Sequence, residues 1–292
     1  VGYAALGSNT TGSQNTAVGY IALNANTIGV ANTAVGYSSL NSNTTGSYNN
    51  AFGYTSLTSN TTGVYNSAFG HGSLANNTIG IGNVAIGYYA SLSNTTGNSN
   101  TAVGSQALFA NTIGPYNVAV GYNSLLSNNS GGYNTAVGYN TLSANTFGGY
   151  NVAMGVSTLA ANTTGNKNTA VGRAALWSNV VVSNNSAFGY MSLRFNTTGV
   201  NNVSVGLQAL YVNTGGYNNV AIGNAALAAN TIGINNVAVG HNSLITNVAG
   251  YANTAVGFQA LENNTSNFNS AFGYRALRAN TTGTFNVAVG HT

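Results

Sequence analysis

The segment that decides the fold is Val35-Gly36-Tyr37-Ser38-Ser39-Leu40-Asn41-Ser42-Asn43-Thr44-Thr45-Gly46-Ser47-Tyr48-Asn49-Asn50-Ala51, which recurs along the whole chain. We number its residues as repeat positions 1 to 17. Copies begin at Val1, Val18, Val35, Phe52, Phe69, Ile86, Val103, Val120, Val137, Met154, Val171, Phe188, Val205, Ile222, Val239, Val256 and Phe272. The copy from Val256 has 16 residues instead of 17, and Val289 to Thr292 open an eighteenth copy. A fixed period of this kind is typical of a solenoid.

The residues that recur at fixed positions favour a β-structure. Position 2 is always Gly, positions 9 and 15 are always Asn, and position 6 is Leu except at Ser91. A 17-residue period is too short for a helical hairpin repeat of roughly 33 residues or more. Two glycines in most copies also disfavour a helix. We therefore predict an all-β fold, a parallel β-solenoid (β-roll) with one coil per repeat, in which residues 1–292 form one continuous domain.

Each copy contains a segment that alternates like a strand. Positions 15 to 3, typified by Asn-Thr-Ala-Val-Gly-Tyr, place alternate residues on two faces. Positions 4 to 8 are predicted to form a second short strand, and positions 9 to 13 a turn. We expect positions 1 and 6 to form the core, and position 3 to face outward because it accepts Tyr, His, Arg and Asn. The core residues of three copies are then Val18, Leu23, Val35, Leu40, Phe52 and Leu57.

The invariant asparagines are interpreted as structural. Stacked coils repeat each position about every 4.8 Å, which lets Asn side chains hydrogen-bond to one another in ladders. The predicted ladders contain Asn9, Asn26, Asn43 and Asn60 at position 9, and Asn15, Asn32, Asn49 and Asn66 at position 15.

The composition argues against several classes of function. Charged residues make up 2% of the chain, against about 25% in an ordinary soluble domain. A net charge of +4 without a basic stripe does not indicate nucleic-acid binding, and no apolar run reaches the ~18 residues of a membrane span. There is no Cys and no Asp, and Glu262 is the only acid, so we expect no enzyme activity, catalytic residue, metal or cofactor.

Three surface features leave alternatives open. Position 3 carries a ridge that includes Tyr20, Tyr37, Tyr54 and Tyr88, a candidate glycan-contact surface whose rings could also simply stabilise one another. Position 10 is Thr in 14 copies, an array that raises ice binding as an alternative. Sequons make Asn43, Asn60 and Asn94 candidate glycosylation sites. Position 9 stays Asn where the sequon is broken, which favours a structural role.

Two copies depart from the pattern. The copy from Val171 contains Trp177, the only Trp, and valines in place of the usual turn. The copy from Val256 lacks one residue near Ser266, where a turn absorbs a deletion best. Glu262 and Arg278 both occupy position 7 of adjacent copies, so we predict a surface ion pair between them.

The Asn-Thr-Ala-Val-Gly core, as in Asn15 to Gly19 and Asn134 to Gly138, resembles the head repeats of YadA-like trimeric autotransporter adhesins. With Ala-Leu-x-x-Asn-Thr-Thr-Gly following, the repeat is also similar to repeats of tail-fibre-type proteins of phages and bacterial surfaces. The resemblance covers the whole chain, although this repeat is longer than that of the adhesin heads. It implies a left-handed β-roll, a homotrimer, and an adhesive or spacing fibre in an extracellular, cell-surface or virion setting.

The chain begins and ends on ordinary copies, without a capping repeat. We therefore expect coils to continue beyond both ends, in a longer polypeptide or by end-to-end stacking into a filament. The partners expected are other copies of the chain and a surface glycan.

Overall fold

The computed structural model describes residues 1–292 and confirms the predicted β-solenoid. The chain is all-β, with seventeen parallel strands and no helix. No helix with the length and hydrophobicity of a membrane span is therefore found. The chain divides into two compact units, Val1–Phe147 and Gly148–Thr292.

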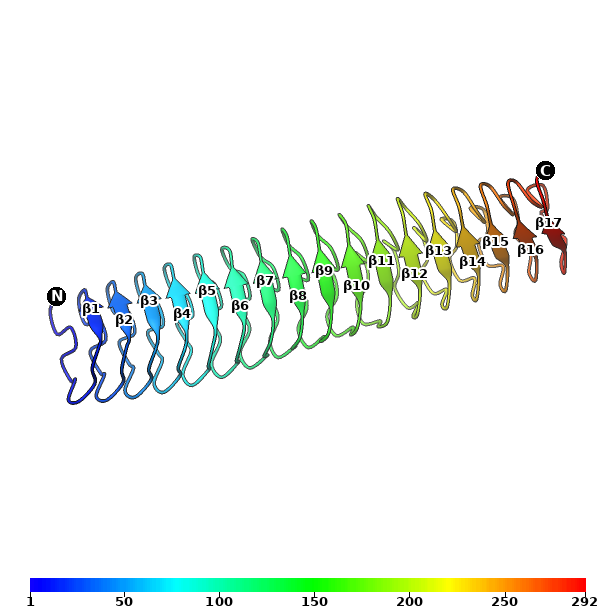
Figure 1. Cartoon of the computed structure of the whole chain (residues 1–292). Coiled ribbons are helices and arrows are strands. Elements are labelled where there is room, and N and C mark those ends of the chain that lie inside the picture. Colours follow the sequence, from blue (N-terminus) through cyan, green and yellow to red (C-terminus); the bar gives the residue numbers. More distant parts are fainter. The chain divides into compact units, whose positions relative to one another are not determined.

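The first unit contains eight three-residue strands, each formed by positions 16, 17 and 1 of the repeat. They are β1 (Thr16–Val18), β2 (Thr33–Val35), β3 (Asn50–Phe52), β4 (Ser67–Phe69), β5 (Val84–Ile86), β6 (Thr101–Val103), β7 (Val118–Val120) and β8 (Thr135–Val137). Each strand pairs in parallel with the next, as Figure 1 shows, and equivalent residues such as Ala17 and Ala34 lie opposite each other. One repeat therefore forms one coil.

The second unit repeats this arrangement through the shortened copy. Its strands are β9 (Val152–Met154), β10 (Thr169–Val171), β11 (Ser186–Phe188), β12 (Val203–Val205), β13 (Val220–Ile222), β14 (Val237–Val239), β15 (Thr254–Val256), β16 (Ser270–Phe272) and β17 (Val287–Val289). Ala255 still lies opposite Ala271. The missing residue falls in the turn, as predicted, and the Ser266 carbonyl accepts hydrogen bonds from the Asn253 and Asn264 side chains.

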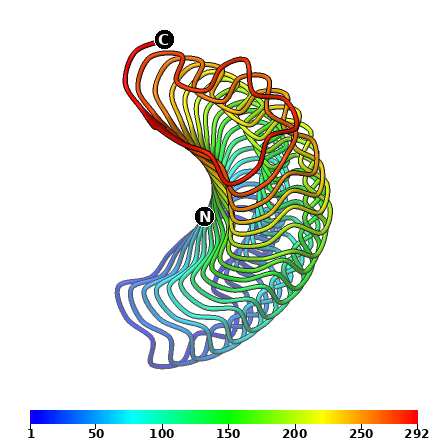
Figure 2. The ribbon, with the colours of Figure 1, turned by 90° about the vertical axis from the view of Figure 1, so that its right-hand side faces the viewer.

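Positions 4 to 8 form turns, so the prediction of a second strand is wrong. Positive φ values recur at positions 4, 6 and 14 of each coil, including 52° at Leu23 and 50° at Leu40. The left-handed conformation costs an L-residue about 1–2 kcal/mol, but here it directs peptide groups along the stack. Ile21 N–H donates to Tyr3 C=O of the coil before (2.8 Å), and Leu23 N–H to Ser39 C=O of the coil after (2.9 Å). Figure 2 shows successive coils within each unit stacked on one another, each slightly turned from the last.

The prediction that positions 1 and 6 both form the core is half wrong. Leu23, Leu40 and Leu57 at position 6 are completely buried, as expected. Position 1 is not: Val18 is 42% exposed, and Val35 and Phe52 are half-buried. The strand alternation is real but reversed, because the Ala at position 17 points inward and its two neighbours point outward.

The contacts of Ser204 explain this reversal. Ser204 replaces Ala at position 17, and its hydroxyl donates to the Ala209 carbonyl at position 5 of the following copy, at 2.8 Å. The hydroxyl of Ser192, at position 5 of the copy that ends at Ser204, lies 2.7 Å from the Ser204 hydroxyl. The strand and the turn segment thus face each other across a gap in which Ala or Ser fits and Val or Phe does not.

The invariant Gly at position 2 has two physical causes. At Gly87 φ is +135°, which L side chains rarely adopt, and an added Cβ would lie 2.6 Å from the Gly104 carbonyl oxygen in the next coil. Any side chain there would push the stacked coils apart.

Candidate functional surfaces

The first buried ladder is formed by the Asn at position 9 and confirms the predicted Asn–Asn bonding. Asn43 Nδ2 donates to Asn26 Oδ1 and to the carbonyl of Gly46, both at 2.9 Å. Asn60 makes the same bond to Asn43, at 2.8 Å. Asn26, Asn43 and Asn60 are completely buried, while Asn9 in the first coil is half-buried. Each amide therefore links its own turn to the neighbouring coil.

The second ladder is formed by the Asn at position 15 and uses the backbone as well. The Asn49 N–H donates to Asn32 Oδ1 at 3.0 Å, and Asn49 Nδ2 donates to the same oxygen and to the Gly63 carbonyl. Asn66 repeats this pattern on Asn49, and the Asn32 N–H likewise donates to Asn15 Oδ1. Buried amides that find these partners avoid the cost of unsatisfied polar groups.

The ladders rule out the candidate glycosylation sites in the folded chain. Asn43, Asn60 and Asn94 are completely buried, and the Nδ2 atom that would carry the glycan already donates two hydrogen bonds in each residue. A glycan cannot be accommodated there without breaking the ladder. The sequons are a consequence of the Asn-Thr-Thr turn.

The tyrosine ridge faces outward, as predicted, but its rings stack on one another. Ring centroids of Tyr20 and Tyr37 lie 5.2 Å apart at 9°, and those of Tyr37 and Tyr54 lie 5.0 Å apart at 11°. Tyr20 also stacks on Tyr3, and Tyr54 on His71, so both faces of these rings have an aromatic neighbour. A sugar that binds by stacking needs a free ring face, which the middle of this ridge does not offer.

Tyr88 lies at the end of this run of rings, because Ser105 occupies position 3 of the next coil. Its ring stacks on His71 with centroids 5.4 Å apart, and the Tyr89 ring lies beside it at 4.1 Å. A side-chain hydrogen bond with Tyr89 raises the pKa of the Tyr88 hydroxyl. At this pair the arrangement of the ridge differs from simple ring stacking.

The position 10 threonines use their hydroxyl protons within the stack. Thr27 Oγ1 donates to the Thr44 carbonyl at 3.0 Å, and Thr44 Oγ1 to the Thr61 carbonyl at 3.1 Å. Their hydroxyls thus link one turn to the next. This use of the donors weakens the interpretation of position 10 as an ice-binding array.

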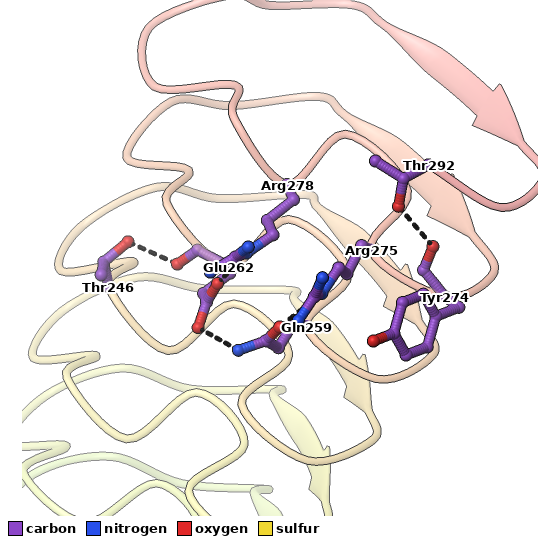
Figure 3. Close-up of polar contacts among 7 residues, drawn as sticks. All are labelled: Thr246, Gln259, Glu262, Tyr274, Arg275, Arg278 and Thr292. Carbon is purple, nitrogen blue, oxygen red and sulfur yellow. Dashed lines mark hydrogen bonds and ion pairs between the residues drawn. The ribbon is translucent and has the colours of Figure 1, made fainter.

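Charged side chains meet at one place in the second unit, shown in Figure 3. Arg278 Nε donates to Glu262 Oε2, which confirms the predicted ion pair. Gln259 Nε2 donates to Glu262 Oε1 at 2.8 Å, and Arg275 Nε donates to Gln259 Oε1 at 2.9 Å. Glu262, which carries the only side-chain carboxylate, therefore forms hydrogen bonds with a cationic guanidinium and with an amide. No group of three His, Cys, Asp or Glu side chains arranged to hold a metal is found.

A second cluster, which we call the Trp177 cluster, was not predicted. It consists of Trp177, Arg194 and Tyr211 at position 7 of three successive coils, with Met191 and Phe195 beside Arg194. The Arg194 guanidinium carbon lies 5.6 Å from the Trp177 ring centroid and 5.0 Å from that of Phe195. Phe195 meets Tyr211 edge to face, with centroids 5.1 Å apart. The shared repeat position of the three residues was the sequence signal that could have revealed this cluster.

No protein-family model matches the chain, and no curated protein resembles it significantly.

Proposed function

We propose that the chain is a non-enzymatic structural segment of an extracellular, cell-surface or virion fibre, with an adhesive role. In this proposal the coils form a left-handed roll, and three chains associate as a homotrimer. The observation that carries the proposal is the outward row of apolar side chains at position 1. This position is always Val, Ile, Phe or Met, yet Phe69 is 39% and Ile86 42% exposed.

Packing inside a single chain does not explain why position 1 is always apolar, because these side chains point outward. Contiguous exposed apolar surface on a protein usually marks an interaction site. The row recurs in every coil, so a copy of the same chain offers a surface with the same axial period. Burying the rows against each other in neighbouring chains would remove apolar surface from water at each coil.

The hydrogen bonds between coils support a fibre rather than a globular domain. Backbone groups and both Asn ladders link each coil mainly to its two neighbours. Such a stack extends by adding identical units, which suits a spacer in a filament.

The test is the mass in solution, measured by light scattering on the full chain and on two triple variants. Phe69→Ser, Ile86→Ser and Val103→Ser together remove three consecutive apolar side chains at position 1. Ile28→Ser, Ile79→Ser and Ile113→Ser form the matched control, because these residues are exposed by 51–55% at position 11.

We expect a mass of three chains for the parent and the control, and of one chain for the position 1 variant. Circular dichroism should be the same for all three proteins. A parent with the mass of a single chain at micromolar concentration would refute the proposed assembly.

A further inference from the structure

We propose that the Trp177 cluster binds an acidic oligosaccharide, with one sugar ring against the free face of Trp177 and the carboxylate of a neighbouring sugar on Arg194. The proposal specifies a ligand for the adhesive role proposed above, and it does not depend on the number of chains. It rests on the hydrogen-bonding state of Arg194, on the exposure of Trp177, and on the absence of a competing carboxylate.

Arg194 has donors without a matching acceptor. Its Nη1 atom lies 3.3 Å from the sulfur of Met191, a weak acceptor, and its Nη2 makes no hydrogen bond. Its Nε is buried, also without a partner, so a ligand can reach only the outer edge of the guanidinium, formed by Nη1 and Nη2. A guanidinium can donate two parallel hydrogen bonds to a carboxylate, and these charge-assisted bonds are stronger than neutral ones. Half-buried against aromatic rings, Arg194 lacks the acceptor that it is suited to hold.

The chain itself does not supply that acceptor. Glu262 is the only acidic residue, and its carboxylate is bonded to Arg278 and Gln259. Arg275, which also lies over aromatic rings, has its Nε bonded to Gln259. Arg275 therefore has a hydrogen-bond acceptor within the chain. Arg194 has only the weak Met191 sulfur, so an anion from solution can accept its remaining hydrogen bonds.

Trp177 provides the apolar surface that a sugar ring requires. Its side chain is 40% exposed, and Ala160 occupies the same position in the coil before it, so no aromatic ring from that coil stacks on it. This differs from the tyrosine ridge, where both faces of a typical ring are covered. An aromatic anchor beside an arginine is also the composition that recognition sites favour.

The experiment uses the fluorescence of Trp177, which reports on this cluster alone because the chain has no other Trp. The full chain is titrated with a galacturonate trisaccharide, and in parallel with the same trisaccharide methyl-esterified at its carboxyl groups. We expect a saturable change with the acid form, weakened at high salt, and at least a tenfold lower affinity for the ester.

Arg194→Gln should weaken binding of the acid form roughly tenfold or more, and Arg194→Lys by an intermediate factor, because Lys keeps the charge but lacks the planar fork. Arg275→Gln is the matched control and should bind like the parent. Circular dichroism checks that each variant folds, and calorimetry replaces fluorescence if a variant alters the emission of Trp177 without ligand.

Equal affinity for the acid and the ester, no response to either, or an unchanged affinity in Arg194→Gln would overturn the proposal. So would an equal response to acetate, which would indicate simple anion binding, or to an acidic peptide at lower concentration. Light scattering on the same samples separates the two proposals, since a failed titration of a three-chain assembly leaves the fibre proposal standing.

Discussion

Replacing Ser91 by Leu should stabilise the first unit, although it introduces a large side chain at a buried position. Ser91 is the one residue at position 6 that is not Leu. It is 1% exposed, and Leu74 and Leu108 occupy the same position in the coils on either side, both completely buried. Its φ of 51° lies within the range of the leucines, so the backbone already accepts a Leu.

The magnitude follows from two contributions. Burying a Leu side chain is worth about 1.5–3 kcal/mol, and removing the Ser91 hydroxyl, which is buried without a partner, relieves a penalty of about 1–3 kcal/mol. Imperfect fit beside Leu74 and Leu108 would offset about 1–3 kcal/mol of this. We therefore expect a net gain of about 2 kcal/mol in the free energy of unfolding.

The assay is urea unfolding followed by circular dichroism, with hydrogen exchange at the amides of this coil. Exchange is needed because a repeat array can open in parts, and the local free energy is then the relevant quantity. Ser73→Leu is the matched control, since Ser73 is also completely buried but its hydroxyl donates to Gly70 at 3.0 Å. It should destabilise the unit. A loss in Ser91→Leu as large as in the control would refute the reasoning, because it would mean that neighbouring side chains already fill the space.

Three further outcomes can be measured in the same way. Asn77→Ala should cost about 2–4 kcal/mol, because it leaves buried ladder partners on both sides unsatisfied, whereas Asn76→Ala, at an exposed neighbour, should stay within about 0.5 kcal/mol; equal losses would contradict a ladder role. Gly87→Ala should destabilise by more than about 2 kcal/mol through its φ and its close approach to the next coil, and a neutral result would argue against the stacking distance. Glu262→Gln should cost no more than about 1 kcal/mol, because the partner Arg278 is 40% exposed, and the difference should shrink in 1 M salt; a salt-independent loss of several kcal/mol would refute a surface pair.

The repeat period allowed the architecture and its polar interior to be predicted. Position 9 is Asn in every full copy, including Asn26 where the sequon is broken, which indicates that the side-chain amide has a structural role. Stacking then requires that equivalent residues meet, which gave the Asn ladders and the Glu262–Arg278 pair. These predictions depend only on which residues share a position, and the period fixes that without knowledge of the coil's shape.

Which side of the strand faces inward was decided only by the tertiary structure. The segment Thr33-Ala34-Val35 alternates equally well in either sense, and its larger apolar residue suggested an inward Val35. The coil closes so tightly that position 17 meets position 5, as the Ser204 contact with Ala209 demonstrates, and only a small side chain fits between them. Left-handed φ at position 6, which turns Leu40 into the interior from a turn instead of a strand, likewise depends on bonds to neighbouring coils. Period and residue identity therefore determined the stack, whereas the width of its interior determined which apolar residues are its core and which remain at the surface.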